Sequence, residues 1–309
     1  MRYRRLGRTK LMTSEVGLGA WAIGGGWGTV DDEVSVAAIR KAVDAGMSFV
    51  DTADVYGEGH SEELIGRALD GNARHRVMIA TKAGLKSPSG TDFSPAHITE
   101  ALEGSLTRLN SEWVDVFQIH NPTQAALEDA ELWETLRRLK AEGKVRAYGA
   151  SVQSPRDALK AIDNGDVDTI QVVFNVIDQE ARTLFETARA RGVAVVARVP
   201  LASGFLSGKY ALDHKFERGD WRARLGEPRR RLMLRRAQAL DPVVVALGST
   251  RAQAALAFVL SYPDVAVTIP GAKTPEQAEE NAAAADFAPL PADLLAHLEQ
   301  AYEAAEGEG

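Results

Sequence analysis

Short apolar runs alternate along the chain with longer segments in which apolar residues recur every three or four positions. The runs are dense in valine and isoleucine and lack polar alternation, which is typical of strands covered on both faces. We expect eight such strands, at residues 16–19, 48–51, 77–82, 114–120, 147–151, 169–174, 194–199 and 265–269.

The segments between these runs carry helix start and stop signals. Pro95 and Pro155 each stand in a first helical turn, where proline is favoured, and Ser61 with its following glutamates resembles a side-chain cap. We expect helices within residues 31–46, 61–71, 95–109, 127–141, 154–165, 180–191, 250–261 and 275–285.

Strand signals separated by helix signals predict a parallel sheet. Because no break divides the repeats into halves, we favour a closed (β/α)8 TIM barrel that forms a single domain over residues 1–309, with an open doubly wound sheet as the alternative. Residues 2–15, with Gly7 mid-way, predict an N-terminal β-hairpin that can plug the barrel bottom. Residues 201–247 form a long loop after strand 7, and we expect this loop to be functional.

Composition narrows the class of protein. The 309 residues are 45% hydrophobic and 26% charged, which excludes a disordered or fibrous chain. The net charge of −7 does not favour nucleic acid or an anionic membrane as a partner. Cysteine is absent, which excludes disulfides and thiolate chemistry. The longest charge-free stretch, residues 16–30, is too short and glycine-rich for a membrane span, so we expect a cytoplasmic protein.

Several familiar motifs match only in part. Residues 17–22 fit the loose dinucleotide pattern, but no helix follows them, which argues against a Rossmann phosphate loop. Residues 149–153 approach a nucleophile elbow but end in glutamine, and residues 204–209 are one residue short of a P-loop. The six histidines include no pair at metal-ligand spacing, so the sequence indicates no metal site.

Polar residues stand at the carboxyl ends of three expected strands. Asp51 ends the second strand and is followed by Tyr56, Lys82 ends the third, and His120 ends the fourth. Taken alone, Asp51 can cap a helix and His120 can be a core histidine, whereas a buried lysine needs a partner. Because a barrel presents these ends at one mouth, we expect the four side chains to converge.

The chemistry of these four residues is complementary. A phenol titrates near pH ~10, and a neighbouring ammonium lowers that pKa while a carboxylate keeps the ammonium charged. The sequence therefore predicts that Tyr56 can exchange a proton near neutrality, with His120 orienting a carbonyl oxygen beside it. Such an acid protonates an alkoxide as hydride reaches the carbon. Since these residues carry no hydride, a nicotinamide cofactor is implied.

The stretch at residues 49–57 is followed, in order, by stretches at residues 80–82, 118–122, 148–151, 200–204, 269–273 and 280–281. Together they resemble the signature of the aldo-keto reductases, and the matches cover most of the chain. The resemblance implies a barrel that binds NADP(H) without a Rossmann domain and reduces aldehydes or ketones to alcohols. The implied partner is a small carbonyl or alcohol substrate.

The resemblance also implies a role for each matching residue. Tyr56 is the general acid, Asp51 and Lys82 tune it, and His120 positions the carbonyl. Lys273 supplies the cation that a 2′-phosphate needs. The implied cofactor contacts, from the nicotinamide end to the adenosine end, are Trp21, Asp51, Ser151, Gln171, Pro200, Leu201, Ser203, Lys209, Gly271, Lys273, Gln277, Glu280 and Asn281.

Two positions depart from the family pattern. Many members carry an aromatic residue that stacks on the nicotinamide two positions before Pro200, where this chain has Arg198. Many have Ser-Asn where this chain has Ser151 followed by Val152.

Other side chains allow two interpretations. Four aromatic residues are candidate pocket walls or local packing: Trp27, Tyr56, Phe93 and Trp221. The segment 222–236 holds seven arginines, which indicates either contact with an anion or, as we favour, a solvated helix face.

Two further functions compete with the reductase. The sequence resembles bacterial members related to potassium-channel β subunits, so a non-catalytic NADP(H)-sensing subunit is one alternative. The channel subunits lack the histidine at the fourth strand, so His120 favours an enzyme. An isomerase or lyase using the same acid is a weaker alternative, against which the matched cofactor positions argue.

Overall fold

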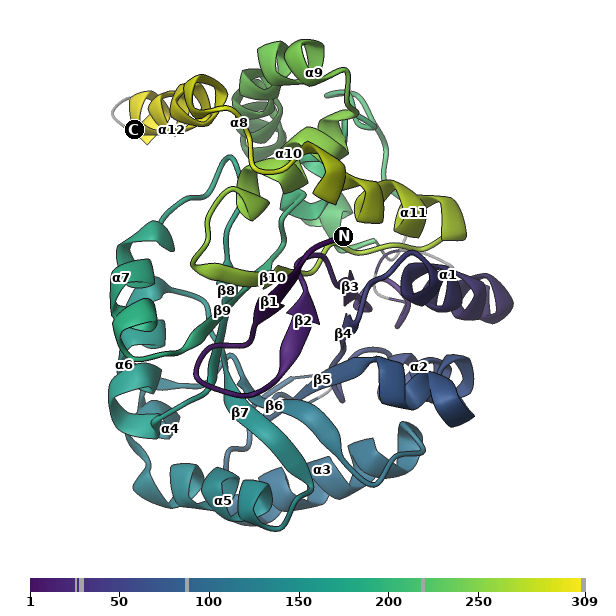
Figure 1. Cartoon of the computed structure of the whole chain (residues 1–309), viewed down its shortest axis with the longest axis vertical. Helices are drawn as coiled ribbons and strands as arrows, with labels where there is room; N and C mark the ends of the chain where they lie inside the picture. Colours follow the sequence, from purple (N-terminus) through teal and green to yellow (C-terminus); the bar gives the residue numbers. More distant parts are fainter. Residues whose placement is uncertain (26, 28–30, 87–88, 218–219, 307–309) are drawn as a thin grey trace.

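Eight parallel strands make the central sheet of the structure, which is a computed structural model that describes residues 1–25, 27, 31–86, 89–217 and 220–306. They are β3 (Leu18–Gly19), β4 (Phe49–Asp51), β5 (Met78–Ala83), β6 (Val114–His120), β7 (Val145–Ser151), β8 (Thr169–Val173), β9 (Ala194–Arg198) and β10 (Val265–Thr268). Parallel bridges from Val16 to Thr268 and from Gly19 to Gly271 join the two edges of this sheet, which closes the barrel (Figure 1). The predicted (β/α)8 barrel is confirmed.

The strand side chains alternate between the barrel lumen and the surrounding helices. Inward-facing residues that pack together in the lumen include Phe49, Ala80, Val116, Val196 and Val267. Outward-facing residues that pack with the helices include Val50, Ile79, Phe117, Ile170 and Val195. Because both faces are covered, these strands appear in the sequence as mainly apolar runs without polar alternation.

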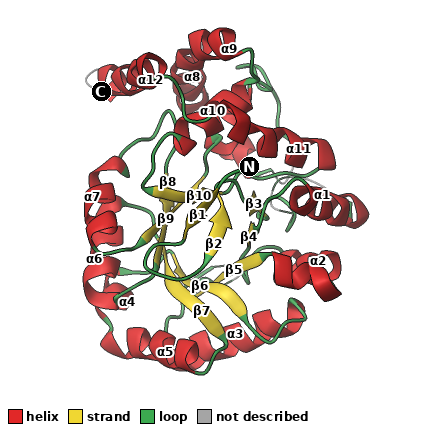
Figure 2. Cartoon of the chain, in the orientation of Figure 1, coloured by secondary structure: helices red, strands yellow, loops and turns green. Residues whose placement is uncertain are grey.

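Helices surround the barrel on its outside (Figure 2). They are α1 (Asp32–Asp44), α2 (His60–Ala68), α3 (Pro95–Arg108), α4 (Gln124–Glu128), α5 (Ala130–Ala141), α6 (Pro155–Gly165), α7 (Arg182–Ala190), α10 (Arg251–Leu260) and α11 (Pro275–Ala283), with the short 3₁₀ segments η1 (Gly71–Arg76) and η5 (Ala284–Phe287). Their starts follow local rules. For example, Thr250 and Gln253 form a reciprocal capping box at α10.

Two helix predictions are wrong in detail. No side chain caps α2, which begins after Gly59. The Ser61 hydroxyl donates instead to Ala20 O at 3.1 Å, which ties α2 to the loop after β3. The segment 127–141 is divided between α4 and α5, because Asp129 ends the first helix and caps the second.

The N-terminal hairpin lies across one end of the barrel (Figure 1). Its strands, β1 (Tyr3–Arg5) and β2 (Met12–Ser14), pair antiparallel. Leu6 is fully buried among the lumen residues. At Gly7, which has a φ of 57°, an added Cβ would lie 2.4 Å from Gly192 O, so only glycine fits the approach to the barrel. The hairpin therefore closes the bottom of the barrel as predicted.

The connection between β9 and α10 carries structure of its own. It contains η2 (Ala202–Ser207), η3 (Trp221–Arg224), α8 (Glu227–Ala237), η4 (Gln238–Leu240) and α9 (Asp241–Leu247). The arginine-rich run is divided by this structure, since Arg222 is buried whereas Arg229, Arg231 and Arg235 on α8 are exposed. The solvated-face interpretation therefore fits α8 but not Arg222. The C-terminal helix α12 (Ala292–Glu306) packs against α8.

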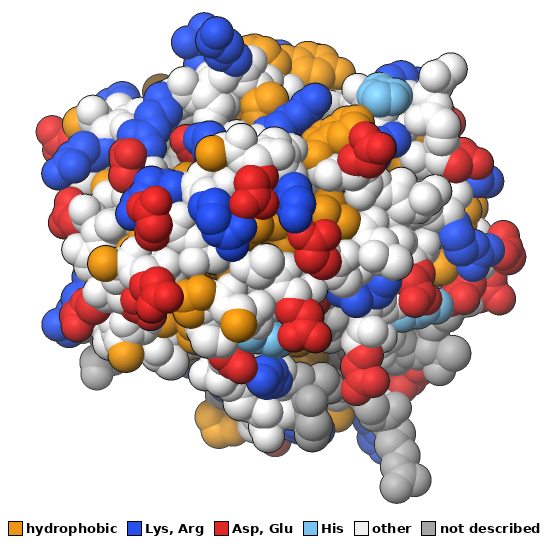
Figure 3. All heavy atoms as spheres, turned by 90° about the horizontal axis from the view of Figure 1, so that it is seen from below, with side chains coloured by type: hydrophobic (Ala, Val, Ile, Leu, Met, Phe, Trp, Pro, Cys, Tyr) orange, Lys and Arg blue, Asp and Glu red, His pale blue; other side chains and the backbone are white. Residues whose placement is uncertain are grey.

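The charge of the surface and the lengths of the helices bear on whether the protein binds nucleic acid or a membrane. On the face shown in Figure 3, which lies on the side of α3 and α5, acidic and basic side chains are interspersed. On α5, Arg137 pairs with Glu134 at 2.9 Å. Among the described residues no single helix is long and apolar enough to cross a membrane, although one bent pair, Glu227–Leu247 with Arg251–Leu260, passes by length and composition alone.

Candidate active site

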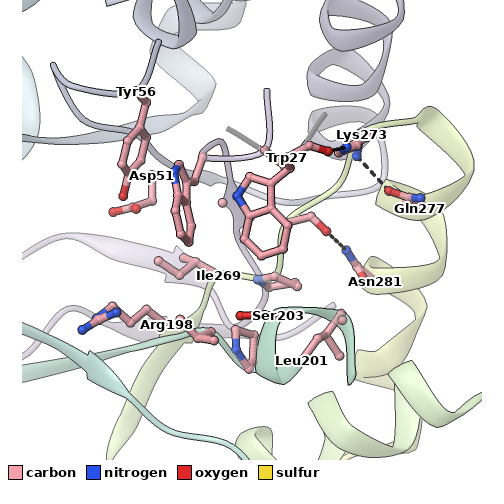
Figure 4. A pocket seen from close by; sticks show the side chains of 18 of the residues that line it. Trp27, Asp51, Tyr56, Arg198, Leu201, Ser203, Ile269, Lys273, Gln277 and Asn281 are labelled. Carbon is pink, nitrogen blue, oxygen red and sulfur yellow. Dashed lines mark hydrogen bonds between the residues drawn. The ribbon is translucent and has the colours of Figure 1, made fainter. Parts of the chain in front are cut away.

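A cavity of about 490 Å³ opens where the barrel strands end at their carboxyl termini. Every residue predicted for the site lines this cavity except Lys82, whose side chain is fully buried. Figure 4 shows Tyr56 and Asp51 toward one end, and Lys273 and Asn281 toward the other. We refer to these as the reacting end and the cationic end.

Lys82 is the central group of the reacting end. Its Nζ lies 2.6 Å from Asp51 Oδ1, 2.6 Å from Thr52 O and 3.4 Å from Tyr56 Oη. Burial by itself lowers the pKa of Lys82, but the charge of Asp51 and the phenol of Tyr56 outweigh it and raise that pKa above its ordinary value. Lys82 is therefore a permanently charged neighbour of Tyr56.

Tyr56 keeps its proton in this environment. Burial raises the pKa of the phenol above 10, and the attraction of Lys82 offsets this only in part because Asp51 opposes it. The prediction that Lys82 brings the pKa of Tyr56 down toward neutrality is therefore wrong. The sequence shows the ammonium but not the loss of water around the phenol. A protonated phenol is a proton donor.

His120 is the second polar group at the reacting end. It ends β6, its side chain is 7% exposed, and its ring centre lies 5.8 Å from that of Tyr56 at an interplanar angle of 81°. Burial, together with the charges of Lys82 and Arg198, holds the pKa of His120 well below 6.5. The imidazole is thus neutral at pH 7, and a neutral imidazole donates one hydrogen bond.

A hydrogen-bonded chain continues from Asp51 across the strand ends. Gln171 Nε2 donates to Asp51 Oδ2 at 2.7 Å, and Ser151 Oγ donates to Gln171 Oε1 at 3.1 Å. Parallel pairing explains the order, because His120 stands beside Ser151 and Ser151 beside Gln171 in the register. Asp51 is thereby held on both oxygens, with Lys82 on one and Gln171 on the other.

The loop after β9 shapes the middle of the cavity. Ser203 and Gly204 have left-handed backbone, with φ of 58° and 90°. Such turns direct successive amide groups toward one side, as in anion-binding loops. Arg222 Nη1 donates to Ser203 O at 3.0 Å and to Tyr210 Oη at 2.9 Å, and Asp220 pairs with the same guanidinium at 2.6 Å.

The cationic end is built from three basic side chains and the start of α11. Lys209, Arg222 and Lys273 all line the cavity. The Lys273 backbone N–H donates to Gln277 Oε1 at 2.8 Å, and its ammonium donates to Trp27 O. Asn281 Nδ2 donates to Gly271 O at 3.2 Å, which links α11 to the loop after β10. A helix start among cations is a favourable place for phosphate.

A model of the Aldo/keto reductase family matches residues 15–303. The chain belongs to the aldo/keto reductase family. It is 33% identical over 293 residues to "Uncharacterized oxidoreductase YqkF" of Bacillus subtilis, covering 93% of this chain and 92% of that protein. It is 32% identical over 322 residues to "NADH-specific methylglyoxal reductase" of Escherichia coli, covering 96% and 98%. It is also 31% identical over 309 residues to "Probable voltage-gated potassium channel subunit beta" of Oryza sativa subsp. japonica, covering 94% and 93%.

Solved structures of this family share the fold. The aldo-keto reductase AKR11C1 from Bacillus halodurans, in its holo form, matches with a TM-score of 0.82 and 26% identity, covering 97% of this chain and 96% of that chain. The glycerol dehydrogenase AKR11B4 from Gluconobacter oxydans matches with a TM-score of 0.82 and 29% identity, covering 98% and 95%. Family membership supports nicotinamide-dependent carbonyl reduction as the general class of activity.

Aromatic residues of this aldo/keto reductase cover the cavity. Trp21 stacks with Trp221, with ring centres 6.1 Å apart, and Trp27 meets Trp221 edge-on at 5.7 Å. The loops after β3 and β9 therefore meet over the site. Of the four candidate pocket walls, Trp27 and Tyr56 line the cavity, whereas Phe93 and Trp221 do not. Phe93 packs against Gly84, where an added Cβ would lie 2.2 Å from the Phe93 ring, so local packing is the correct interpretation there.

Sequence reasoning did not single out Arg222 and Tyr210 as residues of this site. Arg222 and Tyr210 line the cavity and bond to one another, but the sequence presents Arg222 only as one of a run of arginines. No spacing distinguishes it from the exposed arginines of α8. Its place depends on Asp220, which accepts from the Arg222 backbone amide at 2.9 Å and from its side chain.

Proposed function

We propose that this protein is an NADP(H)-dependent reductase of aldehydes or ketones in which Tyr56 is the general acid. The observation that carries the proposal is the arrangement of three side chains at the reacting end. The protonated phenol of Tyr56 lies 3.4 Å from the buried ammonium of Lys82 and faces the neutral ring of His120. A carbonyl oxygen between phenol and imidazole meets two hydrogen-bond donors.

Each residue then has a defined part in moving one proton. His120 donates a hydrogen bond to the carbonyl oxygen and orients it. Tyr56 transfers its proton to that oxygen as negative charge develops there. Lys82 stabilises the phenolate that remains, and Asp51 keeps the ammonium in place through the 2.6 Å contact. Trp21 and Trp27 line the cavity, and their rings meet edge-on.

The described residues fit a nicotinamide dinucleotide. When bound, this cofactor would supply the hydride to the carbonyl carbon. The amide and hydroxyl of Gln171 and Ser151 suit a carboxamide at the reacting end, and the cations suit phosphates at the other. We assign the cofactor contacts to Trp21, Asp51, Ser151, Gln171, Pro200, Leu201, Ser203, Lys209, Gly271, Lys273, Gln277, Glu280 and Asn281, all of which line the cavity.

A preference for NADP(H) over NAD(H) is part of the proposal. Only the phosphorylated cofactor carries a 2′-phosphate. Lys273 lies at the start of α11. Burial lowers the pKa of Lys273, and the neighbouring charge of Arg222 lowers that pKa further. Asp220 and Glu217 attract Lys273, but neither forms an ion pair with it among the described residues, so its ammonium can take a phosphate as a closer anion. One relative is named NADH-specific, so this preference needs its own test.

A non-catalytic sensing subunit is the second candidate, because relatives named as potassium-channel β subunits match over the same length. The two functions differ in one measurement. With a panel of small aldehydes and ketones, a reductase consumes NADPH, as followed by the absorbance of the reduced nicotinamide. A sensing subunit binds NADPH but leaves it unchanged with every carbonyl. The reverse assay, with NADP⁺ and a panel of alcohols, guards against missing an enzyme that favours oxidation.

A further inference from the structure

Arg198 places a guanidinium group at the reacting end of the cavity. It is the last residue of β9, where Ala194 and Val196 point into the lumen, so the alternation of the strand directs Arg198 inward as well. Figure 4 shows it on the opposite side of the cavity from Tyr56 and Asp51. Its side chain lines the cavity at the rim of the barrel.

The guanidinium is incompletely partnered. Its Nη2 donates to Val152 O at 2.9 Å, while its Nε is buried and has no hydrogen-bond partner among the described residues. Within the described ranges, Arg198 forms no ion pair. Burial lowers the pKa of Arg198, but an arginine side chain in a protein keeps its proton at neutral pH.

Asp51 and Asp178 both attract Arg198, but neither forms an ion pair with it among the described residues. Lys82 and Asp51 form a close pair whose charges cancel. His120 is neutral at pH 7 because its pKa is far below 6.5. Tyr56 is protonated. At the reacting end, Arg198 is therefore a cation with no ion pair to a carboxylate among the described residues.

We propose that Arg198 makes this site bind the reduced nicotinamide cofactor more tightly than the oxidised one. The inference rests on the proposed function, because it requires the nicotinamide ring to occupy the volume bounded by Tyr56, His120 and Arg198. The ring carries a positive charge when oxidised and none when reduced, while the rest of the cofactor is the same. Only the oxidised ring is repelled by an unpaired guanidinium, whereas the planar guanidinium packs well on a neutral ring.

This selectivity affects which form is bound when the reduced and the oxidised cofactor are both present. In such a mixture the reduced form occupies a larger share of the sites than its concentration alone would give, and the oxidised form leaves more readily after turnover. Binding selectivity does not alter the overall equilibrium of the reaction. It relieves inhibition by the oxidised product and so suits an enzyme that works as a reductase.

The test compares dissociation constants for NADPH and NADP⁺, measured by quenching of the tryptophans that line the cavity. Removing the charge in R198Q or R198M lowers the ratio of the oxidised to the reduced constant by about tenfold, which corresponds to about 1.4 kcal/mol. Most of this change comes from tighter binding of NADP⁺. R198K is the matched control, because it keeps the charge and holds the ratio within about threefold of wild type. Circular dichroism establishes that each variant is folded.

The outcomes separate this inference from the proposed function. A ratio that is unchanged in both folded neutral variants overturns the role of Arg198 and leaves the reductase proposal standing. Equal weakening of both cofactor forms also overturns it, because a merely structural role weakens both alike. If wild-type protein binds neither NADPH nor NADP⁺, the proposed function itself is wrong.

Discussion

Lys82 Nζ lies 2.6 Å from Asp51 Oδ1 but 3.4 Å from Tyr56 Oη, so the ammonium is held by the carboxylate and only approached by the phenol. In the resting site the phenol is the weaker partner and keeps its proton. A phenolate would attract the ammonium more strongly. In the mechanism that we propose, the buried cation therefore stabilises Tyr56 most in the state that follows proton transfer.

Removal of the Tyr56 hydroxyl is expected to abolish the acid without removing the cavity. For Y56F we predict a loss of about 10²–10⁴-fold in turnover, with the NADPH dissociation constant near that of wild type. Steady-state kinetics and fluorescence titration measure the two quantities. Y3F on the exposed hairpin is the matched control and keeps full activity. Wild-type turnover in Y56F would rule out the assigned acid.

Breaking the buried pair from one side is expected to destabilise the fold. In K82M the Asp51 carboxylate stays buried without its cation, and we predict a loss of about 3–5 kcal/mol in the free energy of unfolding. The double variant D51N/K82M removes both charges and is expected to lose less than K82M alone. Urea unfolding measures both. The buried-charge argument is contradicted if K82M unfolds at the same urea concentration as wild type.

The sequence predicts best where a local pattern has a single structural solution. The run 114–120 is β6 to the residue, and all of its residues are buried, including the polar Asp115 and Gln118. The convergence of Asp51, Tyr56, Lys82 and His120 followed from their places at strand ends, since a barrel brings those ends together.

The sequence fails where an outcome depends on distant contacts. The pKa of Tyr56 is raised mainly by the loss of water around the phenol in the folded chain, and the sequence near Tyr56 does not show this loss. Arg222 looks like its exposed neighbours until Asp220 and Tyr210 hold it at the cavity. The segment 127–141 has continuous helical spacing. However, the Asp129 side chain caps the start of α5, and this cap divides the segment into two helices.

Selection for the 2′-phosphate is expected to depend on Lys273. For K273A we predict that NADPH binding weakens by about tenfold or more, as expected for loss of a hydrogen bond to a charged group, while NADH binding changes little. Fluorescence titration with both cofactors measures the difference. The exposed K10A variant is the control for a lost surface charge. Equal losses for NADPH and NADH would remove the assigned role.

Asp54 is expected to make stability depend on pH. Burial, followed by repulsion from Glu62, raises the pKa of Asp54 from 3.8 to about 7. Between these values the folded chain holds a proton that the unfolded chain has lost. The stabilisation is therefore fully present below pH 3.8 and is lost as pH rises through about 7. D54N removes the titration, so we predict that it raises the melting temperature more at about pH 8 than at about pH 5.

Thermal unfolding of wild type and D54N across this range tests the assignment. The matched control is D213N, which changes an exposed aspartate on the loop after β9. It is expected to follow the wild-type pH profile. A D54N profile parallel to that of wild type would show that another group is responsible for the pH dependence.

The barrel bottom and the reacting end are expected to respond independently to substitution. Leu6 is fully buried against the lumen residues, far along the strands from the cavity. For L6A we predict a loss of about 2–5 kcal/mol in the free energy of unfolding, measured in urea, with unchanged cofactor dissociation constants in the folded variant. M12A, at a side chain on the same hairpin that is 51% exposed, is expected to leave both quantities near wild type. If L6A weakens cofactor binding, the hairpin influences the site through the lumen and is more than a plug.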